Sequence, residues 1–156
     1  NVDEKSLPDG NKYSDACIEK FSGENIIIVC ADIEDQIMSL QTTDRKDFMF
    51  ESGIKSTGLD NLIKTGYDTL GLSTFFTSGP EESRAWTIEK NSKAADAAGI
   101  IHTDFKKKFI RAETVTHKDF IKYKGFSECK DAGKLRLEGK DYLVNDGDVM
   151  YFRVGS

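Results

Sequence analysis

The first half of the chain contains one continuous apolar run among helical patterns. Residues 26–30 read Ile-Ile-Ile-Val-Cys, which predicts a strand covered on both faces, as in a parallel sheet flanked by helices. Helices are predicted around this run at residues 14–21, 33–41 and 44–50. A single strand cannot satisfy its own backbone hydrogen-bonding groups. We therefore expect this half to be the tail of a larger α/β domain whose other strands lie outside the sequence.

The clearest helix of the first half is predicted at residues 59–70. Thr57 is a suitable N-cap for it, and Gly71 suits the left-handed conformation that ends many helices. Its apolar side chains recur at helical spacing along one stripe, at Leu59, Leu62, Ile63, Tyr67 and Leu70.

Strand patterns dominate the second half of the chain. A hairpin is expected around Gly79 and Pro80, and a turn at residues 145–148. The predicted strands cover residues 73–78, 84–90, 109–116, 137–144 and 149–154.

Helices are expected between these strands. One is predicted from Ala94 to Phe105 with Ser92 as its cap, although Gly99 is expected to bend or break it. Two short helical pieces follow at residues 118–123 and 127–132. The resulting order is that of a small α+β sheet with a helix across one face, and it matches the β-grasp (ubiquitin-like) fold.

Charge is divided unevenly along the 156 residues, whose net charge is −5. Residues 1–72 carry seven basic and fourteen acidic side chains, whereas residues 73–156 carry fifteen basic and thirteen acidic ones. The most basic stretch, residues 106–140, contains eleven basic and five acidic side chains. We therefore expect two modules, residues 1–72 and 73–156, with different partners.

Composition argues against several classes of protein. No apolar run approaches the ~20 residues of a membrane-spanning helix, and no basic-then-apolar segment typical of a secretory signal peptide is found in the sequence. Three cysteines without C-x-x-C spacing predict reduced thiols in a cytoplasmic protein and no metal site.

His102 lacks a nucleophile to activate, so a structural or capping role is expected, and Trp86 is expected in the core. Because the sequence opens at Asn1 without Met, we expect a fragment or a processed product.

Several segments resemble the YchF / Obg-like ATPase family, which joins a P-loop nucleotidase domain to a C-terminal β-grasp module called the TGS domain. They are residues 58–63, 74–77, 84–88, 97–105, 109–113, 133–142 and 146–149. The resemblance covers nearly the whole chain. It implies a β-grasp TGS domain over residues 73–156, preceded over residues 1–72 by the C-terminal remnant of an α/β P-loop nucleotidase domain.

The resemblance also places a purine-recognition site at the start of the chain. Asn1-Val2-Asp3-Glu4 matches the family's N-x-x-E motif, which stands where related GTPases have N-K-x-D, and Cys30-Ala31 resembles a second base-contacting loop. The residues implied to bind nucleotide are Asn1, Val2, Glu4, Cys30 and Ala31, with the N–H of Ala31 facing the purine. From the residues alone, a frayed terminus and ordinary packing explain the same positions.

The N-x-x-E motif bears on the choice of base. An Asn side chain can pair with N6 and N7 of adenine. The longer Glu4 displaces the carboxylate that reads guanine, which favours ATP or a relaxed choice between ATP and GTP.

No G-x-x-x-x-G-K-[ST] motif occurs in the sequence. The chain therefore lacks the loop that holds phosphates and Mg²⁺, and we expect no catalytic residue in it and no hydrolysis by it alone. The resemblance implies that the parent protein hydrolyses ATP or GTP with Mg²⁺ as cofactor.

A basic cluster is the second candidate site. Clustered lysines attract phosphates by releasing counterions, and TGS modules resemble RNA- and ribosome-associated adaptors. The residues expected to contact RNA or the ribosome are Lys106, Lys107, Lys108, Arg111, Lys134 and Arg136. An ordinary solvated face near a helix C-terminus explains the same residues. No DNA or membrane partner is expected.

Two functions are compatible with these patterns. In the first, the chain is the C-terminal portion of a cytoplasmic, ribosome-associated ATP/GTP nucleotidase. In the second, residues 73–156 form a stand-alone, non-enzymatic β-grasp module that binds a protein partner, and the preceding segment is a linker or a vestige.

Overall fold

The computed structural model describes residues 1–155 and divides the chain into two compact units. The first unit is Asn1–Leu70, and the second begins at Gly71. Each unit is described separately below. Assignment of the first unit to a nucleotide-binding domain stays a prediction.

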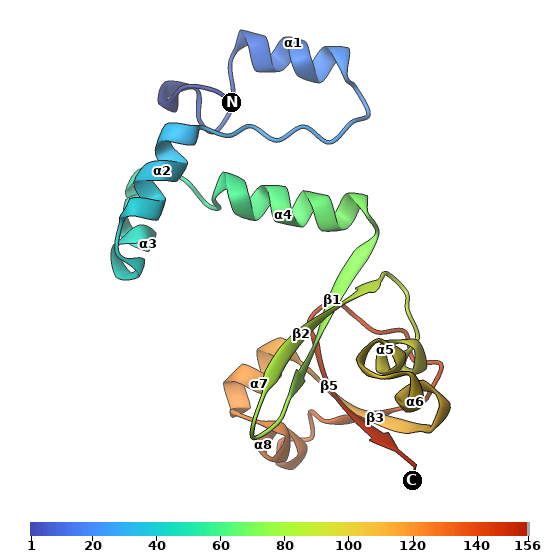
Figure 1. Cartoon of the computed structure of the whole chain (residues 1–156). Helices are drawn as coiled ribbons and strands as arrows, with labels where there is room; N and C mark the ends of the chain where they lie inside the picture. Colours follow the sequence, from blue (N-terminus) through green and yellow to red (C-terminus); the bar gives the residue numbers. More distant parts are fainter. Residues whose placement is uncertain (156) are drawn as a thin grey trace. The chain divides into compact units, whose positions relative to one another are not determined.

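The first unit is built from helices (Figure 1). Thr57 caps the last of them by accepting the N–H of Asp60 at 3.0 Å, as the sequence predicts. The elements are the 3-10 helix η1 (Glu4–Ser6) and the helices α1 (Lys12–Lys20), α2 (Ala31–Ser39), α3 (Thr42–Glu51) and α4 (Gly58–Thr69).

The apolar run at residues 26–29 belongs to no sheet within the described part of the chain. Figure 1 shows it as a long connection between α1 and α2. Its backbone meets the start of the chain where Val2 donates its N–H to the carbonyl of Val29 at 2.8 Å. The prediction of a strand covered on both faces is therefore wrong for this chain, because no neighbouring strand is present and Ile26 is 38% exposed.

The apolar stripe of α4 is also largely uncovered. Leu62 is 58% exposed and Leu70 71% exposed, and Leu59 and Ile63 are exposed as well. The buried residues of the unit form a small cluster of Cys30, Ile33 and Ile37. The helix thus forms at the predicted position, but its apolar face has little of this chain to pack against.

The second unit contains a five-stranded sheet with the order β2-β1-β5-β3-β4. Strand β1 pairs in parallel with β5, and all other neighbours are antiparallel. The strands are β1 (Leu72–Ser78), β2 (Ser83–Glu89), β3 (Phe109–Thr116), β4 (Arg136–Glu138) and β5 (Asp148–Val154). This topology, with the first and last strands central and parallel, confirms the β-grasp prediction.

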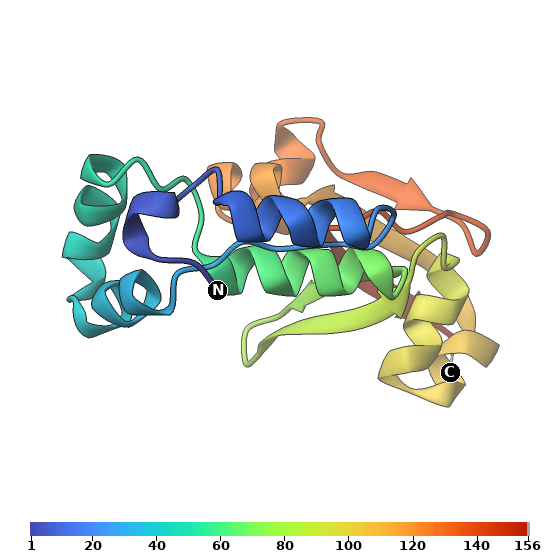
Figure 2. The same ribbon diagram turned by 90° about the horizontal axis from the view of Figure 1, so that it is seen from above.

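Helices cover both faces of the sheet (Figures 1 and 2). On one face α5 (Ala94–Ile101) and α6 (Thr103–Lys107) enclose a core that includes Phe75, Met150 and Phe152. On the other face α7 (His117–Tyr123) and α8 (Phe126–Asp131) cover Val115 and Val149. Strand alternation explains the division, because Val149 and Met150 point to opposite faces.

Three local predictions in this unit are wrong. Lys93, not Ser92, is the N-cap of α5, and the Ser92 hydroxyl donates to the carbonyl of Glu89 at 2.7 Å. The helix breaks at His102, whose backbone is extended (φ −158°, ψ 139°), rather than at Gly99. The strand expected at residues 137–144 shortens to β4.

A buried carboxylate holds the turn before β5. Asp148 is 2% exposed and accepts hydrogen bonds from the Tyr142 hydroxyl at 2.8 Å, the Asn145 N–H at 3.0 Å and Arg136 at 3.1 Å. Burial, followed by the hydrogen bond from its hydroxyl to Asp148, raises the pKa of Tyr142. Replacing Asp148 would leave three donors without an acceptor.

We expect Asp148→Ala to lower the free energy of unfolding by about 2–3 kcal/mol, since three hydrogen bonds to a charged, buried acceptor are lost. Urea unfolding followed by circular dichroism measures the change. Asp131→Ala, at an exposed carboxylate on α8, is the matched control and should shift stability by less than about 0.5 kcal/mol. Equal losses in both variants would contradict the structural role of Asp148.

A second prediction concerns two glycines of α4. A Cβ at Gly58 would lie 2.6 Å from Cγ1 of Val29, whereas a Cβ at Gly66 would meet no atom within 4 Å. Gly58→Ala should destabilise the protein by about 1–3 kcal/mol through overpacking. Gly66→Ala should stabilise it by about 0.5–1 kcal/mol, because alanine is the better helix former. Thermal unfolding of both variants tests this contrast, and the same sign of change in both would refute it.

Candidate functional site

The start of the chain and the start of α2 meet at one corner of the first unit. The side-chain oxygen Oδ1 of Asn1 accepts the backbone N–H of Ala31 at 3.0 Å. One residue along, the N–H of Val2 donates to the carbonyl of Val29. The structure therefore brings together Asn1, Val2, Cys30 and Ala31, four of the five residues expected to bind nucleotide.

The hydrogen bond at this corner bears on one expectation. The N–H of Ala31, which is expected to face the purine, is donated in this structure to Oδ1 of Asn1. With Oδ1 so engaged, the Nδ2 group of Asn1 is the part of the side chain with hydrogens left to donate. N7 is an acceptor on both adenine and guanine, so a contact from Nδ2 to N7 would hold either base without distinguishing them.

Glu4, the fifth residue, opens η1 and is exposed. The neighbouring Asp3 has the structural role here, since its carboxylate caps η1 by accepting the N–H and the hydroxyl of Ser6 at 3.1 and 3.0 Å. Glu4 is thus presented at the surface by a capped turn. The cap formed by Asp3 was not predicted from the sequence, although Asp is one of the residues preferred at N-caps.

Cys30 contributes to the corner through its backbone. Its side chain is 2% exposed and packs with Ile33 and Ile37 of α2. The thiol therefore belongs to the small core of the unit, and ordinary packing accounts for this side chain. Ala31, the first residue of α2, is exposed.

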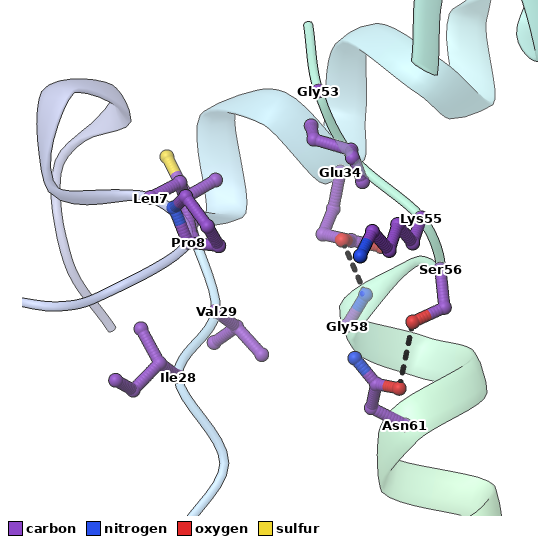
Figure 3. Close-up of a pocket in the computed structure, with 12 residues that line it drawn as sticks. Leu7, Pro8, Ile28, Val29, Glu34, Gly53, Lys55, Ser56, Gly58 and Asn61 are labelled. Carbon is purple, nitrogen blue, oxygen red and sulfur yellow. Dashed lines mark hydrogen bonds between the residues drawn. The ribbon is translucent and has the colours of Figure 1, made fainter. Parts of the chain in front are cut away.

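A cavity of about 280 Å³ lies behind the corner, and its lining includes Cys30, Val29 and Glu34 (Figure 3). At its far side, Oε1 of Glu34 accepts the N–H of Gly58 at 2.6 Å. This bond ties the first turn of α2 to the first turn of α4, and a carboxylate is favourable at a helix N-terminus. Glu34 therefore has a structural role at this end of the cavity. Sequence reasoning missed it, because no local pattern pairs residues 24 positions apart.

The basic cluster separates into paired and unpaired residues. Lys106 forms an ion pair with Asp96 at 2.6 Å. Arg136 binds Glu138 at 2.9 Å and Asp148 at 3.1 Å, and so belongs to the buried network before β5. Lys107, Lys108, Arg111 and Lys134 are exposed, and the structure records no ion pair for these four residues.

Two other residues have the roles expected from the sequence. The Nδ1 atom of His102 accepts the N–H of Asp104 at 3.2 Å and caps α6, so its role is structural. Trp86 packs against the core of the second unit and donates its Nε1–H to the hydroxyl of Thr77 at 2.9 Å. Within residues 1–155, no group of three His, Cys, Asp or Glu side chains is arranged to hold a metal ion. None of the helices described is long and apolar enough to cross a membrane.

Comparison with known proteins gives consistent matches. Residues 72–155 match the family model YchF-GTPase_C, described as a protein of unknown function (DUF933). Two curated relatives named "Ribosome-binding ATPase YchF" come from Bacillus subtilis (50% identical over 153 residues) and Escherichia coli O157:H7 (48% over 154 residues). Each match covers 97% of this chain and 42% of the relative. The chain thus spans about two fifths of the length of these proteins.

A solved structure agrees with these matches. "Structure of the Schizosaccharomyces pombe YchF GTPase" superposes with a TM-score of 0.79 at 34% identity, over 98% of this chain and 42% of that one. The second unit is accordingly a β-grasp domain of the TGS type. Since the family model covers more than half of the residues, the chain belongs to the YchF family.

Proposed function

We propose that the chain is the C-terminal portion of a cytoplasmic, ribosome-binding ATPase, in which the first unit contacts the nucleotide base and the second contacts RNA. The observation that carries this proposal is the hydrogen bond from Ala31 to Asn1, which joins the two segments expected to form a purine site. Relatives of about 50% identity carry the name of a ribosome-binding ATPase.

The nucleotide part of the proposal assigns a role to each residue of the corner. Nδ2 of Asn1 donates to N7 of the purine, and the backbone at Val2, Cys30 and Ala31 forms the wall beside the ring. The exposed carboxylate of Glu4 replaces the acceptor that would read N1 and N2 of guanine. These contacts fit the base of ATP, or of GTP with relaxed preference.

This chain has no loop suited to binding the phosphates and Mg²⁺. In the proposal they are held by the remaining length of the longer protein, where hydrolysis takes place. The uncovered apolar residues of the first unit support such a neighbour. Ile26 on the extended run and Leu62 on α4 are suited to packing against further strands and are exposed here.

The second part of the proposal concerns RNA on the ribosome. Lys107, Lys108, Arg111 and Lys134 have exposed side chains available to phosphates. Lys106 and Arg136 contribute less, because each already binds a carboxylate of this chain.

The nucleotide site is tested by titrating fluorescent ATP and GTP analogues into the full-length protein and its Asn1→Ala variant. Losing the hydrogen bond to N7, together with the support that Asn1 gives to Ala31, should weaken binding of both nucleotides about tenfold. Asn25→Ala, which removes an exposed amide bound to Thr69, serves as the control and should bind like the unchanged protein. Failure of the unchanged protein to bind either purine nucleotide would reject the site.

The ribosome contact is tested by co-sedimentation of the full-length protein with ribosomes at increasing salt. Binding should weaken steeply between 50 and 200 mM salt, as for any complex held by phosphate contacts. Absence of co-sedimentation at low salt would reject the ribosomal part of the proposal. Salt-dependent co-sedimentation without nucleotide binding would instead favour a non-enzymatic β-grasp module.

A further inference from the structure

The sheet of the second unit has a stretch of one face that α7 and α8 do not cover. Tyr151 is 44% exposed and Leu137 60% exposed. The paired positions are Arg111 with Arg153, and Glu113 with both Tyr151 and Leu137. Residues opposite each other in antiparallel strands share a face. We call these five residues the open sheet face.

The open sheet face is the one opposite to α5. Met150 and Phe152, the neighbours of Tyr151, lie in the core under α5, and successive side chains of a strand alternate between faces. Val149, two residues before Tyr151, is covered together with Cys129 of α8. Beyond Val149 this cover ends, so the last two outward side chains of β5, Tyr151 and Arg153, reach the surface.

Two arginines face each other on this surface. Arg111 and Arg153 occupy opposite positions of β3 and β5, and like charges directly opposite destabilise a sheet. Glu113 neutralises only one of the two arginines, because its carboxylate accepts a hydrogen bond from Nε of Arg153 at 2.9 Å. The structure records no hydrogen bond or ion pair for the exposed guanidinium group of Arg111. A cation without a partner beside a second cation is an arrangement that an anion would stabilise.

An aromatic platform lies next to the arginines. The guanidinium of Arg153 lies over the Tyr151 ring, 4.5 Å from its centroid. The rings of Tyr151 and Phe126 pack edge to face, with their centroids 6.4 Å apart. These contacts hold the ring in place while leaving it partly open. Nucleic-acid bases stack on aromatic rings and on arginine planes.

Further positive charge lies beside Arg111 and Arg153, at the end where β3 begins and β5 finishes. The N–H of Gly155 donates to the carbonyl of Lys108 at 2.8 Å, so the chain around Lys107 and Lys108 adjoins the row of Arg111 and Arg153. Unpaired cations therefore extend from the open sheet face toward the end of α6. Of the five residues that define this face, Leu137 is the aliphatic one, which fits a polar, negatively charged partner better than an apolar protein surface.

We infer that the open sheet face binds a single-stranded segment of RNA, with a base stacked on Tyr151 and Arg153 and a phosphate held by Arg111. This inference rests on the proposed ribosome contact and specifies the surface that makes it. It extends the proposed RNA site from exposed cations such as Lys108 and Arg111 to Tyr151 and Arg153 of β5.

The test uses a fluorescein-labelled octauridylate and fluorescence anisotropy with the full-length protein. Tyr151→Ala should weaken binding at least fivefold and leave the salt dependence unchanged, because stacking involves no counterion. Tyr151→Phe should bind within twofold of the unchanged protein. Arg111→Ala should reduce the slope of log K against log salt by about 0.7, the value for one phosphate contact on a single strand.

Arg84→Ala is the matched control. Arg84 also lies over an aromatic ring, that of Trp86 at 4.3 Å, but Trp86 packs against the core on the face opposite to Tyr151. This variant should bind octauridylate like the unchanged protein. Thermal unfolding of every variant separates loss of binding from loss of folding, and the salt slope of Arg111→Ala keeps the inference falsifiable if Tyr151→Ala unfolds.

The outcomes separate this inference from the proposed function. Ribosome co-sedimentation without octauridylate binding, or with binding that Tyr151→Ala and Arg111→Ala leave unchanged, would overturn the inference and keep the proposed ribosome contact. Loss of ribosome binding in Tyr151→Ala without any affinity for octauridylate would point to a protein partner and overturn the RNA assignment. If the unchanged protein fails to co-sediment with ribosomes, the proposed ribosome contact fails, whatever octauridylate does.

Discussion

The requirement that backbone hydrogen-bonding groups be satisfied explains the difference between the two units. In the second unit, parallel pairing of β1 with β5 places the first and last strands at the centre of one sheet, and every strand has a neighbour. In the first unit, residues 26–29 have strand composition without strand partners, and contact the start of the chain through Val2. Helix α4 forms regardless, because a helix satisfies its own backbone. Its apolar stripe is exposed because the described part of the first unit contains no sheet that could cover it.

Periodicity and turn chemistry were enough to predict the β-grasp order, and the structure confirms it. They failed where a side-chain hydrogen bond accompanies the local conformation. The Ser92 hydroxyl donates to the carbonyl of Glu89, and the N-cap of α5 is Lys93, one residue later than expected. The expected strand over residues 137–144 is shortened to Arg136–Glu138, and just beyond it Tyr142 bonds to Asp148. The periodicity of apolar positions does not reveal either hydrogen bond, because both join polar side chains to nearby groups.

The candidate sites show a similar limit. The sequence gives the number of cations in residues 106–140, but the fold decides which of them are already neutralised. Lys106 is paired with Asp96, which lies on the preceding helix, and Arg136 is paired with Asp148 twelve residues later. Tyr151 and Arg153 were not predicted as site residues. The alternation of side chains along the last strand does not show which face of the sheet the helices leave uncovered. The resemblance located Asn1 and Ala31, but only the structure revealed that they bind each other.

In both candidate sites, the fold leaves a polar or charged group without a partner inside the protein, and this group is the one assigned to a ligand. At the first site, Oδ1 of Asn1 accepts the N–H of Ala31, so the Nδ2 group is the part of this side chain with hydrogens left to donate. On the open sheet face, Glu113 neutralises Arg153 and so lets a second arginine be held opposite it. In each case one polar group is bound internally to position another for an external partner. A purine and a phosphate are the simplest ligands that complete these two arrangements.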